Sequence, residues 1–416
     1  MGKVLFVSYG GGHINIINEV IKEIIKYKNI DFKVLALTTA YDKSVSLFSN
    51  KYIKKISDYK DLFKKDIEEI NYYGSLILED NYNASSGISK EDTLIYLGLS
   101  MFELVQTHGE QKAFDLYNKK KRQAFLPVNI MKKILEYEDI SLVVTTTSPR
   151  FEEASLTAAN ELGIETIQIL DLFGELYPLP KANHIVCMNS YISESLKRQG
   201  LIKNKYYYFG QPAIEKTVKN ILSIDKVIIK NKLELNSNKT LLYATQKPNI
   251  YNEDFSYYDF AGYETINDNI FSIFEFLYEK YNINILVRLH PNENFNDYKK
   301  WFDKYNFVQY INNKCNLEES LAICDILLNQ ASTVSVEAIS ANKDVFTFKY
   351  HLDKTFPLPA VMNEPFIFSD GFEELKQKLS LYFENKLKIK KTGNFLALDS
   401  VENILKLIED LVWILW

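Results

Sequence analysis

The chain has 416 residues, a formal net charge of −5 and a pI near 5.8, so it lacks the basic stripe that nucleic-acid binding requires. Hydrophobic residues make up 46% and charged residues 25%, a composition that is typical of folded globular proteins and argues against extensive disorder. At this length we expect two domains of about 200 residues each. From the charge we expect no nucleic-acid partner.

The first half of the chain alternates short apolar runs with segments of helical period. We predict strands at 4–8, 32–38, 141–147, 165–171 and 184–189, and helices at 14–27 and 151–162. The stretch from about 43 to 133 is helical, polar and aromatic in pattern, and we interpret it as a helical insertion. Strands that are apolar on both faces belong in a parallel sheet covered by helices, so a first domain is predicted at 1–209.

A domain boundary is predicted near Pro212, because a strand ends at 206–209 and proline interrupts a regular element. The alternation then restarts, with strands at 240–245, 284–289, 307–311, 326–329 and 344–348, and helices at 270–281, 297–305, 317–323 and 332–341. Right-handed crossovers of this kind form doubly wound sheets, whose ligands bind beyond the carboxyl ends of the strands. We therefore expect an α/β protein with two facing Rossmann-like domains, 1–209 and 210–400, and a deep cleft between them.

The apolar segment 401–416 is predicted to be a helix that packs back on the first domain. A peripheral contact with the inner face of a membrane is the less favoured alternative, because the segment lacks the Lys/Arg-rich polar face that anionic lipid attracts. No stretch approaches ~20 apolar residues and the start is too short for a signal peptide, so we expect a cytoplasmic protein. Three cysteines without a CxxC pair indicate neither a disulfide framework nor a zinc site.

Three glycines and a histidine follow the first predicted strand. Gly11 and Gly12 let the backbone approach a ligand closely and leave helix N–H groups pointing at it. His13 at the helix start is the first candidate for a general base near neutral pH. A tight strand-to-helix turn is the alternative interpretation of the same run.

Three further charged residues follow predicted strands of the first domain. Arg150, Asp171 and Glu175 lie at strand ends that face the same gap, where they could bind an acceptor or replace His13 as the base. Asp171 is the second candidate for the base, and Arg150 and Glu175 are assigned to the acceptor side.

Two strand ends of the second domain carry groups suited to phosphate. Pro291 ends a strongly apolar strand and fixes the turn, which would hold Arg288 and His290 toward the cleft. Both side chains can donate to a phosphate, although His290 could instead be a buried histidine bonded to the backbone. Gln246 and Lys247 end the first strand of this domain, and Lys247 could also meet phosphate, unless the proline after it merely ends the strand.

The stretch from Gln330 to Glu337 begins a predicted helix. The hydroxyls of Ser332 and Thr333, with the free N–H groups and the dipole of the helix start, form an anion site. With Ser332 as the N-cap, the reciprocal capping residue would be Ser335, which leaves Glu337 to accept from two ribose hydroxyls. An ordinary exposed glutamate on a helix is the alternative for Glu337.

These motifs together resemble the GT-B superfamily of glycosyltransferases and the related UDP-N-acetylglucosamine 2-epimerases, over most of the chain. The resemblance lies in the glycine-rich loop with His13, the Gly-x-Pro turn at 210–212, His290-Pro291, and Ser332-Thr333 with Glu337. A His-Pro pair followed by Ser-Thr is similar to bacterial sialyltransferases, including polysialyltransferases. That likeness implies that His290, Ser332 and Thr333 contact the nucleotide phosphate.

The resemblance implies transfer of a sugar from a CMP- or UDP-linked nucleotide-sugar donor to a saccharide acceptor, with cell-surface polysaccharide synthesis as the family-level expectation. The donor phosphate would lie on Arg288, His290, Ser332 and Thr333, and the ribose on Glu337. We expect no cofactor and no metal ion, because no Asp-x-Asp stands at a convincing strand end. The alternatives are a UDP-N-acetylglucosamine 2-epimerase-like enzyme and a catalytically silent partner of another transferase.

Overall fold

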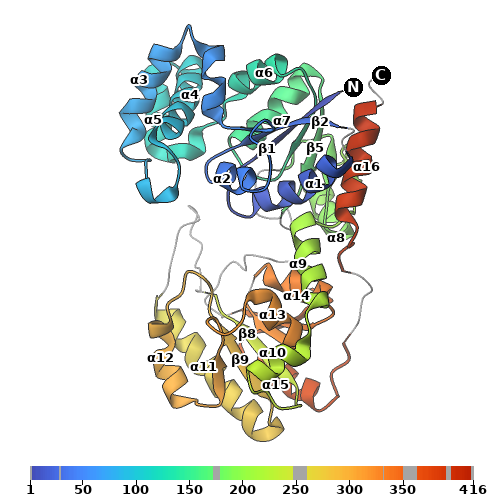
Figure 1. Cartoon of the computed structure of the whole chain (residues 1–416). Helices are drawn as coiled ribbons and strands as arrows, with labels where there is room; N and C mark the ends of the chain where they lie inside the picture. The colour runs from blue at the N-terminus through green and yellow to red at the C-terminus, as the bar shows by residue number, and fades with distance from the viewer. Residues whose placement is uncertain are drawn as a thin grey trace. The chain divides into compact units, whose positions relative to one another are not determined.

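The structure is a computed structural model that describes residues 2–27, 30–171, 179–246, 260–330, 332–349, 363–389 and 395–413. The chain divides into two compact units. Unit 1 consists of Met1–Ala213 with Ala397–Trp416, and unit 2 consists of Ile214–Leu396. The sequence places the corresponding boundaries at 209 and 400. Figure 1 shows both units and labels most of their helices and some of their strands.

Unit 1 contains a seven-stranded parallel sheet in the order β3-β2-β1-β4-β5-β6-β7. Its strands are β1 (Lys3–Ser8), β2 (Asp31–Ala36), β3 (Ile53–Lys54), β4 (Ile140–Thr145), β5 (Glu165–Ile169), β6 (His184–Val186) and β7 (Lys205–Tyr207). Helices α1 (His13–Tyr27), α7 (Phe151–Leu162) and α8 (Ser190–Arg198) connect strands of this sheet. Successive side chains of a strand point to opposite faces, so Leu5 and Val7 join one apolar core while Val4 and Phe6 join another.

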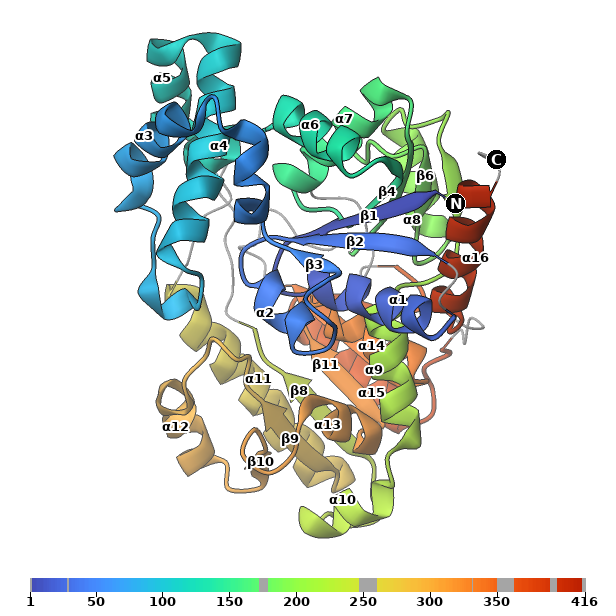
Figure 2. The same cartoon turned by 45° about the horizontal axis from the view of Figure 1, so that its top comes forward.

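The segment between β2 and β4 is mostly helical. It contains α2 (Ala40–Val45), α3 (Ile67–Leu78), α4 (Lys90–His108), α5 (Glu110–Lys120), α6 (Val128–Tyr137) and the 3-10 helices η1 (Ile56–Phe63), η2 (Ala84–Ser86) and η3 (Lys121–Ala124). Strand β3 also lies in it and pairs with β2 at the edge of the sheet. The prediction of a purely helical insertion missed β3, because a two-residue strand leaves no alternating pattern. Figure 2 shows α3, α4 and α5 grouped beside the sheet (Figure 2).

Two glycines set the spacing between α3 and α4. A Cβ on Gly74 would lie 2.5 Å from the carbonyl oxygen of Leu94, and a Cβ on Gly98 would lie 2.3 Å from the carbonyl oxygen of Ile70. Any side chain at either position would therefore force the two helices apart in a closely packed interior.

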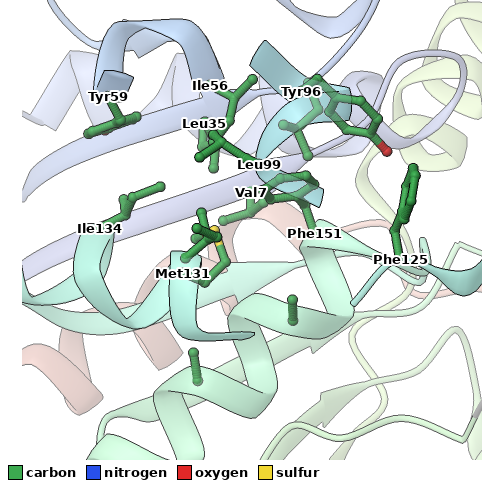
Figure 3. Packing of buried hydrophobic residues seen from close by; sticks show 14 of the residues in the cluster. Val7, Leu35, Ile56, Tyr59, Tyr96, Leu99, Phe125, Met131, Ile134 and Phe151 are labelled. Atoms are coloured by element: carbon green, nitrogen blue, oxygen red, sulfur yellow. The ribbon is translucent and has the colours of Figure 1, made fainter. Parts of the chain in front are cut away.

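An apolar core joins the helical insertion to the sheet. Figure 3 shows Val7 of β1 and Leu35 of β2 packed with Tyr96 and Leu99 of α4 and with Phe151 of α7 (Figure 3). None of these five side chains is more than 6% exposed. Truncating a core side chain of this size typically costs about 2–5 kcal/mol. The insertion is therefore part of the folded core of unit 1.

Helix α16 (Ser400–Trp413) belongs to unit 1. Ile404, Ile408 and Val412 recur with helical spacing and are at most 1% exposed, in a core that they share with α1 and β4. The apolar face of α16 is therefore covered by unit 1. None of the helices within the described ranges is long and apolar enough to cross a membrane.

Unit 2 contains a six-stranded parallel sheet in the order β10-β9-β8-β11-β12-β13. Its strands are β8 (Thr240–Ala244), β9 (Asn284–Arg288), β10 (Val308–Tyr310), β11 (Ile326–Asn329), β12 (Asp344–Lys349) and β13 (Ile367–Asp370). Its helices are α10 (Lys226–Lys232), α11 (Phe260–Tyr281), α12 (Phe295–Lys304), α13 (Leu317–Ile323), α14 (Val334–Ser340) and α15 (Phe372–Phe383).

Helix α9 (Pro212–Ser223) begins where unit 1 passes into unit 2. Pro212 is the first residue of this helix, so the prediction that it interrupts a regular element is wrong. Proline suits that position because the first N–H groups of a helix have no partner within the helix.

Both units confirm the predicted α/β class with Rossmann-like parallel sheets. The strand order reverses between β1 and β4 in unit 1 and between β8 and β11 in unit 2. In open sheets of this type, ligands bind in the crevice beyond the carboxyl ends of the strands at such a switch point. The loops that follow these strands are therefore the first places to look for a site.

Candidate active site

The glycine loop leaves β1 at the switch point of unit 1. A Cβ on Gly10 would lie 1.8 Å from Oγ1 of Thr39, so Gly10 packs directly against the loop that follows β2. Gly11 has a φ of +73°, and both Gly11 and Gly12 are exposed with open space where a Cβ would stand. Nζ of Lys43 donates to the carbonyl oxygen of Gly11 at 3.1 Å. The backbone of Gly11 and Gly12 is therefore accessible to a ligand.

His13 begins α1 and is held by side chains that follow β4 and β5. Its Nδ1 lies 2.9 Å from Oγ1 of Thr146 and 3.4 Å from Oδ2 of Asp171. Asp171 also accepts from the hydroxyl of Thr147. The structure thus brings together the two candidates for the base, His13 and Asp171, and adds two threonines that the sequence did not indicate. The His13 side chain is 27% exposed and stays accessible.

The tautomer of His13 follows from the hydrogen bond that Thr146 makes on its other side. Oγ1 of Thr146 donates its single hydrogen to Oε2 of Glu152 at 2.6 Å, so it can only accept from His13. Neutral His13 then holds its hydrogen on Nδ1, and Nε2 keeps a lone pair that can take a proton. The carboxylate of Asp171 near Nδ1 is placed to stabilise the imidazolium that results.

Glu152 anchors this network from the first turn of α7, where it is fully buried. Its carboxylate accepts from the backbone N–H groups of Tyr9, Thr146 and Ser148, at 2.8, 2.9 and 3.2 Å. Burial holds the pKa of Glu152 above its ordinary value. A positive charge on His13, the hydroxyl of Thr146 and the N–H groups of Tyr9 and Ser148 offset part of that rise. The sequence did not single out Glu152, because an acid in a first helical turn is common and is usually explained by the helix dipole.

Arg150 lies directly before α7 with a φ of +71°, a backbone conformation that strains any residue other than glycine. Its guanidinium carbon lies 4.8 Å from the ring centroid of Tyr9, and its Nε is buried with no hydrogen-bond partner among the described residues. The Tyr9 hydroxyl lies 2.7 Å from that of Tyr96. Arg150 therefore lies beside the network of His13, whereas Glu175 lies outside the described residues.

In unit 2, the neighbouring strands β9, β8 and β11 bring the candidate phosphate-binding residues to one edge of the sheet. Thr245 follows β8, and its N–H donates to the carbonyl oxygen of Arg288 at 2.9 Å, which ties two of these strand ends together. Gln246 comes next and is partly buried, and Lys247 lies outside the described residues.

His290 follows β9 and is exposed, so it is not the buried histidine of the alternative interpretation. Its backbone N–H donates to Oε2 of Glu293 at 2.9 Å and to Oγ1 of Thr245 at 3.1 Å. Its Nδ1 accepts from the N–H of Asn292 at 3.2 Å, so the neutral ring holds its hydrogen on Nε2. Together with Pro291 after it, this turn presents Nε2–H as a hydrogen-bond donor.

Glu293 holds the turn in shape and was not singled out from the sequence. It accepts from the hydroxyl of Tyr298 at 2.9 Å, from the hydroxyl of Thr245 and from the N–H of His290. Its own N–H donates to the carbonyl oxygen of His290 at 2.9 Å. The signal for this role is the His-Pro-Asn-Glu spacing, because an acid three residues on can reach back to a backbone N–H at the start of a turn.

Arg288 uses one of its nitrogen atoms within unit 2. Its Nη1 donates to the carbonyl oxygen of Cys315 at 2.7 Å and lies 3.4 Å from Oγ of Ser320. Nη1 of Arg288 is therefore bonded to the loop before α13, and contact of its other N–H groups with the donor phosphate stays a prediction. The physical reason is that the buried carbonyl of Cys315 needs a donor, and Arg288 supplies it.

The loop before α14 differs from the prediction in its N-cap residue. Thr333, not Ser332, is the N-cap of α14, and its side chain makes no capping hydrogen bond. Ser335 donates to Oδ1 of Asn329 at 3.0 Å instead of taking part in a cap. Ser332 is partly buried and Thr333 is exposed. Gln330 is only 6% exposed, yet its Nε2 has no hydrogen-bond partner within the described ranges.

Glu337 lies in the first turn of α14 and is partly buried. Burial raises the pKa of its carboxyl to about 7, and the negative charge of Glu318 acts in the same direction. Glu318 itself accepts from Nδ2 of Asn220 at 2.9 Å. Glu337 is therefore not an ordinary exposed glutamate. Burial makes its ionised carboxylate less stable, and a hydrogen-bond donor on a ligand would stabilise that carboxylate.

The candidate residues thus gather in two sets, one at each switch point. The first set surrounds His13, and the second spans the loops of Thr245, His290 and Gln330 to Thr333. In the parts of the chain that the structure describes, no group of three or more His, Cys, Asp or Glu side chains is arranged to hold a metal ion.

Comparison with known proteins relates this chain to others through its fold. No family model and no curated protein matches it. The UDP-GlcNAc 2-epimerase from Methanocaldococcus jannaschii is 15% identical, with 98% of this chain and 99% of that chain covered and a TM-score of 0.57. The UDP-GlcNAc 2-epimerase from Neisseria meningitidis, solved with UDP-GlcNAc bound, is 14% identical, with 98% and 100% covered and a TM-score of 0.56. Acinetobacter baumannii MurG is 9% identical, with 99% and 100% covered and a TM-score of 0.50.

At these identities the likeness concerns the fold. The chain has a GT-B-like fold, in which two Rossmann-like units form most of the molecule. These structures agree with the GT-B part of the resemblance seen in the sequence, and they lend no support to its sialyltransferase-like part.

Proposed function

We propose that the chain is a glycosyltransferase that moves a sugar from a CMP- or UDP-linked donor to a hydroxyl group of a saccharide acceptor. The observation that carries this proposal is the state of His13, whose Nδ1 is occupied by Thr146 and whose Nε2 is left to accept a proton. Activation of an acceptor hydroxyl requires a base of this kind. The UDP-GlcNAc bound to the Neisseria meningitidis structure supports a nucleotide sugar as the donor.

The donor side of the reaction is assigned to unit 2. The Nε2–H of His290 and the hydroxyls of Ser332 and Thr333 supply donors for phosphate oxygens at the ends of β9 and β11, which lie on either side of β8. The Nε2 of Gln330 has no partner among the described residues and needs an acceptor, and a nucleotide offers several. Glu337 is proposed to accept from the ribose hydroxyls.

The acceptor side is assigned to unit 1. Nε2 of His13 takes the proton from the acceptor hydroxyl as its oxygen forms a bond to the anomeric carbon of the donor sugar. The bond between that carbon and the phosphate oxygen breaks, and the nucleotide leaves with the bonding electrons. Asp171 stabilises the imidazolium of His13, and the donors of unit 2 stabilise the charge on the departing phosphate.

We propose that the transfer needs no metal ion, since protein donors meet the phosphate charge. Treating the purified protein with EDTA should then leave the rate of transfer unchanged, and added Mg²⁺ should not raise it. A rate that falls on chelation and recovers with Mg²⁺ would show that a metal bridges the phosphate.

The test of the function is a thermal-shift panel of the whole chain with UDP, CMP, CDP, GDP, UDP-GlcNAc and CMP-linked sialic acid. A ligand that binds the native state at a hundredfold excess over its dissociation constant stabilises it by about 2.7 kcal/mol. A shift confined to one base names the donor class, which is then incubated with candidate acceptors while free nucleotide and extended saccharide are measured.

Two outcomes would replace this proposal. A change of configuration at carbon 2 of the sugar, without any acceptor, would identify an epimerase. The absence of a thermal shift with every nucleotide would favour a catalytically silent partner of another transferase.

A further inference from the structure

A cavity of about 400 Å³ lies in unit 1 under the helical insertion. Its walls come from the loops after β1 and β2, from α2, η1, η2, η3 and α4, and from the loop before α7. Tyr9 lines the cavity, and its backbone N–H donates to the carboxylate of Glu152 at 2.8 Å. That carboxylate also accepts from Thr146, the partner of His13, so a chain of hydrogen bonds links the cavity wall to the proposed base.

The chain has few arginines, and two of its four arginines line this cavity. Only four of the 49 basic residues are arginines, namely Arg122, Arg150, Arg198 and Arg288. Arg122 and Arg150 both line the cavity. The planar guanidinium can donate two parallel hydrogen bonds to one carboxylate or phosphate, which the ammonium group of lysine cannot do. In a chain whose other positive charges are nearly all lysines, two arginines in one cavity indicate a site for an anion.

The positive charges of both arginines affect the same side chain of the cavity wall, Tyr96. Burial raises the pKa of the Tyr96 hydroxyl, whereas the positive charges of Arg150 and Arg122 lower it. That hydroxyl lies 2.7 Å from the hydroxyl of Tyr9, over whose ring Arg150 stacks at 4.8 Å. The Nε of Arg150 is buried and has no hydrogen-bond partner among the residues described. This N–H group can therefore donate to a bound anion.

The other charged side chains that line the cavity do not neutralise the positive charges of Arg122 and Arg150. Lys55 and Asp92 form an ion pair at 2.6 Å, and the hydroxyls of Ser57 and Ser89 also donate to Asp92. Asp42 remains as an acceptor for hydroxyl groups on the cavity wall. Tyrosine rings, carboxylates and hydroxyls around two arginines suit a saccharide that has one acidic substituent.

We propose that this cavity binds an acidic saccharide, whose carboxylate or phosphate group lies between Arg122 and Arg150. The identification of that saccharide as the acceptor rests on the proposed glycosyl transfer. Hydrogen bonds through Glu152 and Thr146 link Tyr9 in the cavity wall to His13, so in this proposal a bound saccharide extends a hydroxyl toward the base. The helical insertion then selects which acceptor is used.

The first experiment measures the protection of arginines in the full chain against phenylglyoxal, with the modified residues located by mass spectrometry. With four arginines, each site is read separately. The probes are glucuronic acid for a carboxylate, glucose 6-phosphate for a phosphate, and glucose as the neutral control. One acidic probe, at ten times its dissociation constant, should slow modification of Arg122 and Arg150 about tenfold. Glucose should protect neither residue, and the rate at Arg198 should not change.

The second experiment uses Arg122→Gln, because Arg122 is exposed and its replacement leaves the core of unit 1 intact. This variant should bind the protecting acidic sugar about tenfold to a hundredfold more weakly, as measured by calorimetry. Arg198→Gln removes an equally exposed arginine in the last turn of α8 and should bind that sugar like the unmodified chain.

The outcomes separate this inference from the proposed function. Equal protection by glucose, or no protection of Arg122 and Arg150 by either acidic sugar, overturns the cavity site. A thermal shift with a nucleotide in that case still supports the donor site in unit 2. Protection of both arginines without a shift from any nucleotide supports the acidic-sugar site and removes the transferase.

Discussion

The two units hold their candidate residues in different ways. In unit 1, His13 is fixed through Thr146 to the buried carboxylate of Glu152, so its orientation is set before any ligand arrives. In unit 2, His290 is exposed and held through its backbone, and Thr333 makes no side-chain cap. The first arrangement suits proton transfer, which needs fixed geometry, and the second leaves donors open to a ligand. Substitutions in unit 1 should therefore change turnover, and those in unit 2 should change affinity for the nucleotide.

The largest effect is expected for His13→Ala. Loss of the general base should lower kcat by about 10²–10⁴-fold while the dissociation constant of the donor nucleotide stays the same. Steady-state kinetics and calorimetry measure the two quantities. His108→Ala is the control, because His108 is an exposed histidine in the last turn of α4. A parallel loss of nucleotide affinity in His13→Ala would break the division between the units.

His290→Ala should give the opposite pattern. Removal of the Nε2–H donor should weaken nucleotide binding by about tenfold to a hundredfold, because hydrogen bonds to charged groups are strong. At saturating donor, kcat should fall much less. Calorimetry with the nucleotide found in the thermal-shift panel makes the measurement, and normal binding by this variant would show that the donor site is placed wrongly.

Glu152→Gln tests how far the rigidity of unit 1 depends on one carboxylate. The amide replaces one carboxylate oxygen by an NH2 group, which then faces either the N–H of Tyr9 or the N–H groups of Thr146 and Ser148. This should destabilise the chain by about 1–3 kcal/mol. Urea unfolding measures this loss. Turnover should fall as well, because the imidazolium of His13 loses the nearby negative charge of Glu152. A variant of normal stability with normal turnover would show that the network plays no part in either.

Glu337→Gln should have the smallest effect, and it should appear mainly as a change in pH dependence. The folded-state pKa of about 7 lies above the ordinary value of 4.5, so this carboxyl favours the folded state below pH 4.5 and loses that contribution as the pH rises through about 7. Relative to the unmodified chain, the variant should therefore gain thermal stability at pH 8 compared with pH 5.5. Thermal unfolding at the two pH values makes the comparison.

The same variant tests the ribose assignment. Ribose hydroxyls donate to the ionised carboxylate, so binding of a nucleotide sugar by the unmodified chain should strengthen as the pH rises through about 7. Glu337→Gln should lack this part of the pH dependence. Identical pH profiles of binding for the two proteins would place the ribose elsewhere.

The fold was largely predictable from the sequence, because its signals are local. Helices α7 and α13 and strand β11 begin and end at the predicted residues. Their apolar spacing, helical or continuous, is visible within a few residues of chain. Strand β3 escapes prediction because its two residues cannot show an alternation, and only pairing with β2 defines it.

The site was predictable only as far as residue types reveal it. His13 and His290 could be singled out from the loops that hold them, but the residues that orient them could not. Glu152 accepts a hydrogen bond from Tyr9, which lies 143 positions away in the chain, and no local sequence pattern indicates such a contact. The choice between Ser332 and Thr333 as N-cap depends on backbone angles, which two adjacent hydroxyl residues do not determine.

Helix α16 gives the two units an order of assembly. Unit 2 is one continuous stretch, Ile214–Leu396, whereas the core of unit 1 includes α1 near the start of the chain and α16 after residue 396. Translation proceeds at about 5–20 residues per second, so the surface of α1 and β4 that receives α16 stays uncovered for roughly 10–40 s while unit 2 is synthesised. Unit 2 can complete its core on the ribosome, and unit 1 must wait. A chain truncated before residue 400 would retain both sets of candidate residues and expose this surface permanently.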